Sequence, residues 1–323
     1  MSEDGPLFVV GAPRSGTSLL HYLLAAHPDL AYPDVAIARL WGRRTARAAA
    51  RLGLPVLSSR LLHRAVRPSE GEIAYEPALR FLGLDPELPV EGLFLWNDSD
   101  FGVPAEELRP HHLHDHPAAT GRIRTRYGQL CVRTRRPRVL DKAPAFTRML
   151  DVVLEVFPNA HIVHIVRDGR AVVNSIVYGF RYRGKQWAVE QSGDPVQDAC
   201  RTWSEFVLAG RRGAELVPER YHELRYEALV SSTRVQMLRL FDRTSLPKWG
   251  EELYPVALED RNYKWQRPEA SSFGDAIWTD RAALDPSEYG RLELLRPLLE
   301  SLGYVEAGAA LTRPSRSSIP AAG

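Results

Sequence analysis

Apolar positions near the start of the chain change their spacing at a short glycine-containing turn. Leu7 to Val10 is a continuous apolar run, and the turn Gly11 to Gly16 follows it directly. From Leu19 to Leu24 the leucines recur on one helical face. This order predicts a buried parallel strand, a tight loop and a helix.

A second unit of the same kind lies near the middle of the chain. Val139 and Leu140 form a short apolar strand, Phe146 to Phe157 has helical spacing, and His161 to Val166 is another apolar run. A strand, a helix and a strand in so short a segment form a βαβ unit. We therefore predict an α/β fold in which helices flank a central parallel sheet.

The segment between these two units is predicted to be an insertion. Residues 41–137 contain long stretches rich in Ala, Leu and Arg, which favour helix. Within it, His111 to His116 is predicted to be a loop because Pro110 and Pro117 bracket it. Histidine is a common metal ligand, but no matching Cys or His pair occurs elsewhere, so a metal site is not favoured. Residues 1–310 are predicted to form one domain, and 311–323 a disordered tail.

Composition narrows the class of protein. The 323 residues are 44% hydrophobic and 25% charged, which are values typical of globular proteins. A net charge of +2 does not indicate nucleic acid or an anionic membrane as a partner. The two cysteines, Cys131 and Cys200, cannot make a disulfide framework and fit a reducing cytoplasm. The sequence shows no signal peptide and no apolar run of membrane-spanning length.

The first loop has the chemistry of a phosphate site. A loop at a helix N-terminus points backbone N–H groups at one spot, where the helix dipole favours an anion. Ser15, Thr17 and Ser18 add hydroxyl groups, and Arg14 adds a fixed positive charge. An ordinary strand-to-helix turn is the alternative interpretation.

The nucleotide triphosphatase P-loop, G-x-x-x-x-G-K-[ST], is the nearest rival motif. Gly11 and Gly16 have its spacing, but Thr17 stands where that motif has its lysine. The lysine normally reaches the β- and γ-phosphates, and the next hydroxyl holds magnesium. Its replacement predicts a phosphate site without a triphosphate–magnesium cluster.

The residues from Pro13 to Ser18 resemble the 5′-phosphosulfate loop of sulfotransferases that use 3′-phosphoadenosine-5′-phosphosulfate (PAPS). Arg167 and Ser175 stand eight positions apart, similar to the arginine–serine pair with which that family holds the 3′-phosphate. An ion pair between Arg167 and Asp168 is the structural alternative. The resemblance implies a fold like that of P-loop nucleotide hydrolases, with 41–137 as a helical insertion on the acceptor side.

The resemblance also implies roles for single residues. Lys142 matches the family lysine near the bridging oxygen of the donor, and a simple ion pair with Asp141 is its alternative. Tyr226 matches a tyrosine near the adenine, and Lys264, before Trp265, a lysine that reaches the 3′-phosphate. The residues expected to bind the donor are Arg14, Ser15, Gly16, Thr17, Ser18, Arg167, Ser175, Tyr226 and Lys264, and those expected to take part in catalysis are Arg14, Asp34 and Lys142.

The sequence offers several candidates for the base that takes the proton of the acceptor. Many cytosolic family members have a histidine two residues after the strand-end lysine, where this chain has Pro144. Other members place a glutamate soon after the first helix, where Asp34 is the nearest carboxylate. Asp34 is therefore the candidate base, and it equally suits a helix N-cap. Glu70 and Glu72 are further candidates.

The function implied by the resemblance is transfer of the sulfuryl group of PAPS, without a metal, to a hydroxyl group of a small-molecule acceptor. The expected location is the cytoplasm. The alternatives are a P-loop small-molecule kinase and a non-catalytic nucleotide-binding protein. The identity of the acceptor cannot be read from the sequence.

Overall fold

The computed structural model describes residues 4–33, 91–96, 101–181, 192–247 and 286–312. Several predictions fall outside these ranges: the candidate bases Asp34, Glu70 and Glu72, the predicted nucleotide ligand Lys264, the whole of residues 41–90, and the tail beyond 312. They stay predictions, as does the assignment of 1–310 to one domain.

The described residues form a five-stranded sheet with strand order β2-β3-β1-β4-β5. Every pairing in it is parallel. The central strand β1 is the apolar run at the start of the chain, and its Leu7 pairs with Leu140 on one side and His161 on the other. The predicted α/β fold with a parallel sheet is confirmed. The strands are β1 (Leu7–Val10), β2 (Leu30–Ala31), β3 (Arg138–Lys142), β4 (His161–Val166) and β5 (Tyr221–Arg225).

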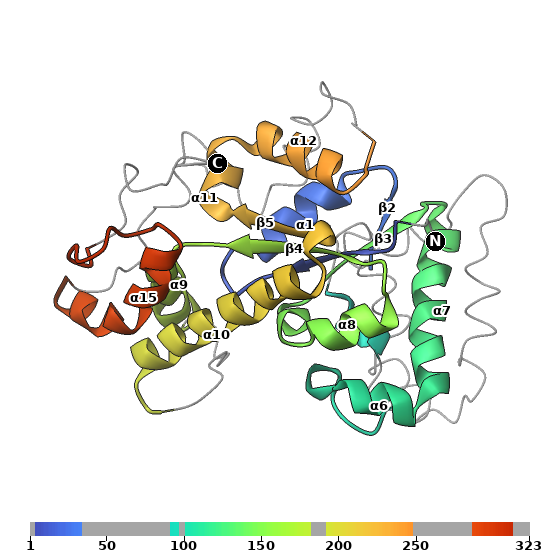
Figure 1. Ribbon diagram of the computed structural model, residues 1–323, viewed down its shortest axis with the longest axis horizontal. Coiled ribbons are helices and arrows are strands. Elements are labelled where there is room, and N and C mark those ends of the chain that lie inside the picture. Colours follow the sequence, from blue (N-terminus) through green and yellow to red (C-terminus); the bar gives the residue numbers. More distant parts are fainter. Residues whose placement is uncertain (1–3, 34–90, 97–100, 182–191, 248–285, 313–323) are drawn as a thin grey trace, which may run out of the picture.

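Helices cover both faces of this sheet (Figure 1). The α-helices are α1 (Thr17–Ala25), α6 (Pro110–Asp115), α7 (Pro117–Thr134), α8 (Leu150–Val156), α9 (Gly169–Arg181), α10 (Pro195–Leu216), α11 (Tyr226–Ser231), α12 (Thr233–Arg243) and α15 (Arg296–Ser301). The 3₁₀ segments are η2 (Gly92–Trp96), η4 (Ala105–Glu107), η5 (Pro144–Arg148), η6 (Pro218–Arg220) and η7 (Pro286–Leu295).

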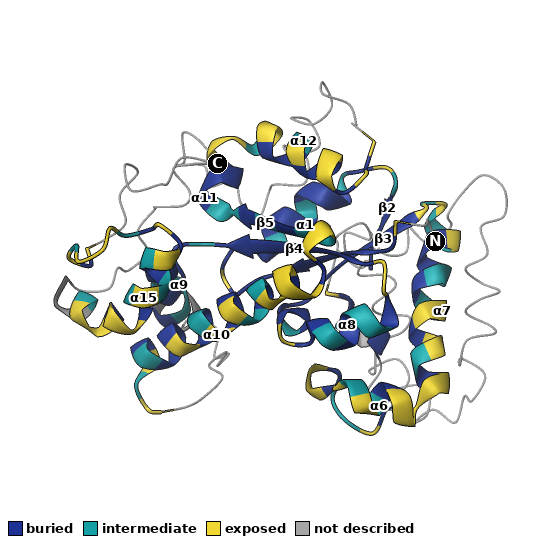
Figure 2. Ribbon diagram, in the orientation of Figure 1, coloured by how far each residue is buried: buried dark blue, intermediate teal, exposed yellow. Residues whose placement is uncertain are grey.

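The alternation of side chains along β1 divides the core between the two faces. Phe8 and Val10 pack among residues of α7 and α8, whereas Leu7 and Val9 pack among residues of α1 and α12. The ring of Phe8 meets Phe146 edge-on, with ring centroids 5.2 Å apart. Figure 2 shows β1 to β4 buried and the outer helix faces exposed; in β5 buried and intermediate residues alternate. Burial on both faces explains why β1 and β4 read as continuous apolar runs.

Two local predictions are wrong because prolines begin helices here. Pro110 and Pro117 are the first residues of α6 and α7, where the missing N–H costs nothing, so His111 to His116 lies mostly in a helix and not in a loop. The predicted helix from Phe146 to Phe157 is divided: η5 begins at Pro144, and only α8 is α-helical.

The histidines around α6 form local contacts. His114 pairs with Glu155 of α8, and the ring of His112 accepts a hydrogen bond from the N–H of Arg109. No group of three or more metal-ligating side chains gathers within the described ranges. In the same part of the chain, every helix is too short or too polar to cross a membrane.

Candidate active site

Four strands bring their carboxyl ends to one edge of the sheet. The loop Gly11 to Gly16 follows β1, Lys142 ends β3, Arg167 follows β4, and Tyr226 follows β5. Because β3 and β4 flank β1 on opposite sides, the strand order reverses at β1. In open parallel sheets a crevice for ligands forms at such a switch point.

The first loop has the backbone geometry of a tight turn. Arg14 and Gly16 have φ angles of 71° and 99°. Ser15 donates both its N–H (3.1 Å) and its hydroxyl (2.6 Å) to the carbonyl of Ala12, so its side chain holds the turn. The next residues begin α1, where N–H groups cannot be satisfied within the helix. The loop therefore presents backbone donors and the exposed side chain of Arg14 at the sheet edge.

Tyr226 joins this loop to the turn after β4. A Cβ atom on Gly16 would lie 2.3 Å from Cδ2 of Tyr226, so the ring packs directly on the glycine. On the other side, Cζ of Arg167 lies 4.4 Å from the centroid of the same ring. This is a cation–π distance. Tyr226 thus supports the guanidinium of Arg167 beside the first loop.

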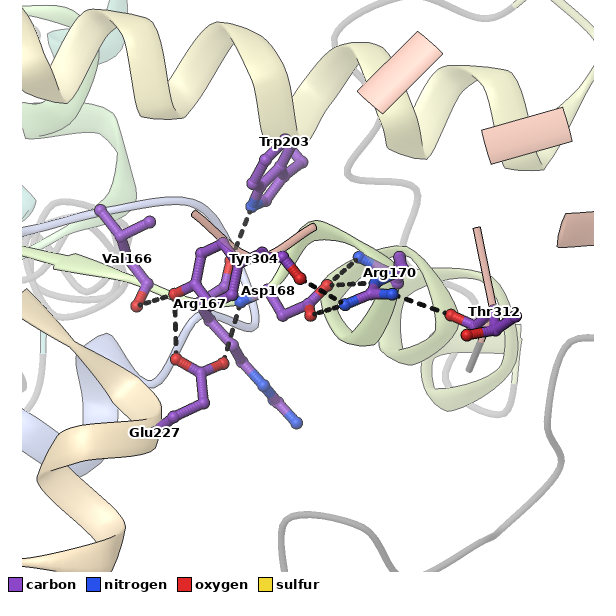
Figure 3. Close-up of polar contacts among 8 residues, drawn as sticks. All are labelled: Val166, Arg167, Asp168, Arg170, Trp203, Glu227, Tyr304 and Thr312. Atoms are coloured by element: carbon purple, nitrogen blue, oxygen red, sulfur yellow. Dashed lines mark hydrogen bonds and ion pairs between the residues drawn. The ribbon is translucent and has the colours of Figure 1, made fainter. Parts of the chain in front are cut away.

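The two predicted phosphate-binding segments touch one another. Nε of Arg14 donates a hydrogen bond of 2.9 Å to Oγ of Ser175, in the second turn of α9. Nη1 of Arg167 donates one of 3.0 Å to the carbonyl of Arg14. Asp168, the mate suggested for Arg167 by the sequence, is held by Arg170, whose Nη2 lies 2.7 Å from its carboxylate. The side chain of Arg167 points away from the pair of Asp168 and Arg170 (Figure 3).

Lys142 has a different partner from the one suggested by its neighbour. Its buried Nζ lies 2.6 Å from Oε1 of Glu91, a half-exposed residue just before η2. Asp141 faces the other way: it accepts hydrogen bonds from the N–H of Gly92 (2.9 Å) and from the hydroxyl of Tyr127. The alternative of a Lys142–Asp141 ion pair is therefore wrong. Burial raises the pKa of Asp141 to about 7.

Glu91 was missed by the sequence analysis, and no local signal could have found it. Its position depends on Asp141, which anchors the N–H of the following residue, Gly92. A Cβ atom on Gly92 would lie 2.2 Å from that carboxylate, so only glycine allows so close an approach. The contact therefore joins two segments that are far apart in the sequence and becomes visible only in the fold.

A buried histidine lies on the α1 side of Lys142. His21 is 2% exposed, and its Nε2 has no hydrogen-bond partner within the described part of the chain. Burial, with the positive charge of Lys142, lowers the pKa of His21 to about 3. The imidazole is therefore neutral at physiological pH and does not repel a cation at Lys142.

Known proteins that are similar to this chain are sulfotransferases. Residues 6–251 match the model of the sulfotransferase family. The omega-hydroxy-beta-dihydromenaquinone-9 sulfotransferase Stf3 of Mycobacterium bovis is 27% identical over 270 residues, which are 75% of this chain and 63% of that protein. This chain thus spans less than two thirds of that relative. The protein-tyrosine sulfotransferase A of Caenorhabditis elegans is 26% identical over 181 residues, 53% of this chain and 46% of that one.

Two solved structures share the fold. Sulfotransferase STF9 from Mycobacterium avium superposes with a TM-score of 0.54 at 16% identity, covering 93% of this chain and 77% of that one. The sulfotransferase domain of the olefin synthase from Synechococcus PCC 7002 gives a TM-score of 0.50 at 21% identity, covering 94% and 98%.

Proposed function

The chain belongs to the sulfotransferase family, and from this premise we propose that it transfers the sulfuryl group of PAPS to a hydroxyl group of a small-molecule acceptor. One observation carries the proposal. Arg14 contacts Ser175, and Arg167 contacts the backbone of Arg14, at the carboxyl edge of the sheet. Both arginines and the serine are thus within reach of a single bound molecule that carries two phosphates.

The donor would use its two phosphates as handles. The 5′-phosphosulfate lies against the backbone donors that begin α1, with Arg14 beside it. The 3′-phosphate accepts hydrogen bonds from the guanidinium of Arg167 and the hydroxyl of Ser175. The adenine lies near Tyr226, and Lys264 adds a second cation at the 3′-phosphate. In this assignment, donor binding replaces the contact of Arg14 with Ser175 by contacts to phosphate oxygens.

The transfer step is an in-line displacement at sulfur. The acceptor oxygen forms a bond to sulfur while the bond from sulfur to the bridging 5′-phosphate oxygen breaks. The products are a sulfate ester and adenosine 3′,5′-bisphosphate. Negative charge grows on the bridging oxygen, and Lys142 at the end of β3 is the cation proposed to stabilise it. To reach the bridging oxygen, Nζ of Lys142 must leave the carboxylate of Glu91 and contact the donor instead.

The acceptor hydroxyl must also lose its proton. We assign this role to Asp34, three residues after the end of β2. Glu91 is a second candidate, because it lies at Lys142 and half of its side chain is exposed. Once Lys142 turns to the donor, the carboxylate of Glu91 loses its cation and becomes free to accept a proton.

The proposal assigns no metal to the reaction. The transferred sulfuryl group bears one negative charge, and Arg14, Lys142 and the backbone N–H groups supply the donors that a leaving phosphate needs. Thr17, in place of the P-loop lysine, also favours a donor other than a triphosphate. The two cysteines are free and buried, which supports a location in the cytoplasm.

The test is calorimetry with adenosine 3′,5′-bisphosphate and with 5′-AMP, each with and without EDTA. We expect EDTA to leave the bisphosphate affinity unchanged and the missing 3′-phosphate to weaken binding. Arg167→Ala and Ser175→Ala should each reduce bisphosphate affinity more than 5′-AMP affinity, by about 1.5–3 kcal/mol for a charge-assisted contact. Equal affinity of the parent for both nucleotides contradicts the 3′-phosphate site. A strict requirement for ATP and magnesium in turnover favours a kinase instead.

A further inference from the structure

The peptide group between Arg167 and Asp168 is held at both of its polar ends. The indole N–H of Trp203 donates to the carbonyl of Arg167 at 3.0 Å. The next N–H, of Asp168, donates to Oε1 of Glu227 at 2.9 Å. Figure 3 shows these two contacts on opposite sides of the turn. Because its C=O and its N–H are both held, this peptide group has little freedom to rotate.

Glu227 joins this turn to the C-terminal part of the chain. Its carboxylate is almost completely buried, and its second oxygen, Oε2, accepts a hydrogen bond of 2.9 Å from the hydroxyl of Tyr304. Burial raises the pKa of Glu227. A buried carboxylate is costly unless its oxygens are hydrogen-bonded, and here each oxygen has its own donor.

A second set of contacts ties the same two segments together. Arg170 donates to the carbonyls of Tyr304 (3.2 Å) and Thr312 (2.9 Å) while its guanidinium also pairs with Asp168. Arg225, at the end of β5, lies over the ring of Tyr304 at 4.9 Å. The segment 302–312 is thus fastened to the turn after β4 at several points.

Tyr226 and Glu227 act on Arg167 from consecutive positions at the start of α11. The ring of Tyr226 packs against the guanidinium of Arg167, and the carboxylate of Glu227 fixes the peptide group that follows Arg167. Tyr226 therefore fixes the position of the guanidinium of Arg167, and Glu227 fixes the backbone from which that side chain extends. Groups that bind an anion work best when such neighbours hold them in advance.

We propose that Glu227, through its contact with Tyr304, is the positioning residue that aims Arg167 at the 3′-phosphate of the donor, so that the segment 302–312 takes part in donor selectivity. The inference rests on the proposed function, since it needs a donor with a 3′-phosphate. Glu227 itself touches no donor atom in this assignment; its effect passes through Arg167.

Two substitutions separate this role from simple packing. Glu227→Gln keeps the size but leaves one carbonyl oxygen for two donors. With its amide nitrogen at Asp168, two N–H groups face each other; with it at Tyr304, the hydroxyl has to turn toward the carbonyl of Val166, 3.5 Å away. Tyr304→Phe keeps the ring under Arg225 and removes only the hydroxyl that Glu227 accepts from. Glu223→Gln is the matched control: its carboxylate lies on β5 and binds Arg211 (2.7 Å) and Tyr221 (2.9 Å) instead of the Arg167 turn.

The measured quantity is the ratio of the affinity for adenosine 3′,5′-bisphosphate to that for 5′-AMP, by calorimetry on the full chain, with the melting temperature recorded beside it. We expect Glu227→Gln to reduce this ratio about tenfold, by analogy with the smallest losses that follow when a metal ligand loses the partner that orients it. Tyr304→Phe should reduce it by a smaller factor. Glu223→Gln should lower the melting temperature and leave the ratio at the parental value.

Each outcome has a distinct meaning. A parental ratio near one removes the 3′-phosphate site, and with it both the proposed function and this inference. A parent that discriminates, with Glu227→Gln and Tyr304→Phe at the parental ratio, overturns the inference and leaves the function standing. If Glu227→Gln does not fold, Tyr304→Phe decides alone, and an unchanged ratio in it overturns the positioning role.

Discussion

Replacing Gly16 with alanine tests the central contact of the candidate site. Gly16 has φ of 99°, a conformation that residues with a Cβ atom rarely adopt. A strained backbone of this kind costs about 1–3 kcal/mol. The new Cβ would also lie 2.3 Å and 2.7 Å from two ring carbons of Tyr226. Since carbon atoms settle about 3.5–4 Å apart, the ring has to move by more than about 1 Å.

That displacement reaches Arg167. The guanidinium lies 4.4 Å from the ring centroid, and a cation–π contact is worth about 0.5–2 kcal/mol. We therefore expect Gly16→Ala to lose about 1–3 kcal/mol of unfolding free energy and to bind adenosine 3′,5′-bisphosphate about 2- to 30-fold more weakly.

Urea unfolding followed by circular dichroism measures the first quantity, and calorimetry measures the second. Gly128→Ala is the matched control, because Gly128 lies within α7 and nothing stands within 4 Å of its added Cβ. Alanine there should stabilise the protein by about 0.5–1 kcal/mol and leave binding unchanged. A Gly16→Ala protein as stable as the parent, with parental affinity, would refute the packing of Tyr226 between the loop and Arg167.

Two further predictions concern proton acceptance and pH. Asp34→Asn should lower kcat with bisphosphate affinity unchanged; if it turns over at the parental rate and Glu91→Gln does not, the base is Glu91. Burial lowers the pKa of His21 to about 3 and that of His164 to about 4, whereas a histidine in the unfolded chain has a pKa of about 6.5. Lowering the pH from 8 to 5.5 therefore protonates these histidines only in the unfolded chain, and each should lower the free energy of unfolding by about 1.4 kcal/mol. Asp141, whose pKa burial raises to about 7, opposes this by about 2 kcal/mol. The measurement is therefore the difference in this pH dependence between the parent and His164→Asn, and an identical dependence contradicts it.

Contiguous patterns were sufficient to predict the core of the fold and the two segments, around Arg14 and around Arg167, that meet at one edge of the sheet. The apolar runs of β1 and β4 are recognisable because both of their faces are buried. The loop Gly11 to Gly16 and the spacing of Arg167 and Ser175 are local, so their convergence follows from the rule that parallel strands end at one edge. β2 has only two residues, Leu30 and Ala31, and no periodicity can reveal so short a strand.

The partners of charged residues could not be predicted in the same way. The sequence suggested Asp141 for Lys142 and Asp168 for Arg167 because they are adjacent. Asp141 and Lys142 are neighbours along β3 and point to opposite faces, whereas Arg167 and Asp168 lie in the turn after β4, where adjacency does not fix the partner. In the fold, Lys142 meets Glu91, and Asp168 meets Arg170. The histidines of α6 were predicted to lie in a loop because prolines flank them. A proline also suits the first position of a helix, so its presence alone could not distinguish the two structures.

The central place of β1 has a consequence for how the protein is made. Leu7 pairs with Leu140, a separation of about 130 residues, and β4 emerges later still. At a synthesis rate of about 5–20 residues per second, β1 waits about 7–26 seconds before either of its neighbours, β3 or β4, is made. During that interval an unpaired strand of LFVV is exposed to other chains. The nascent chain is therefore a natural client for chaperones that bind short apolar segments.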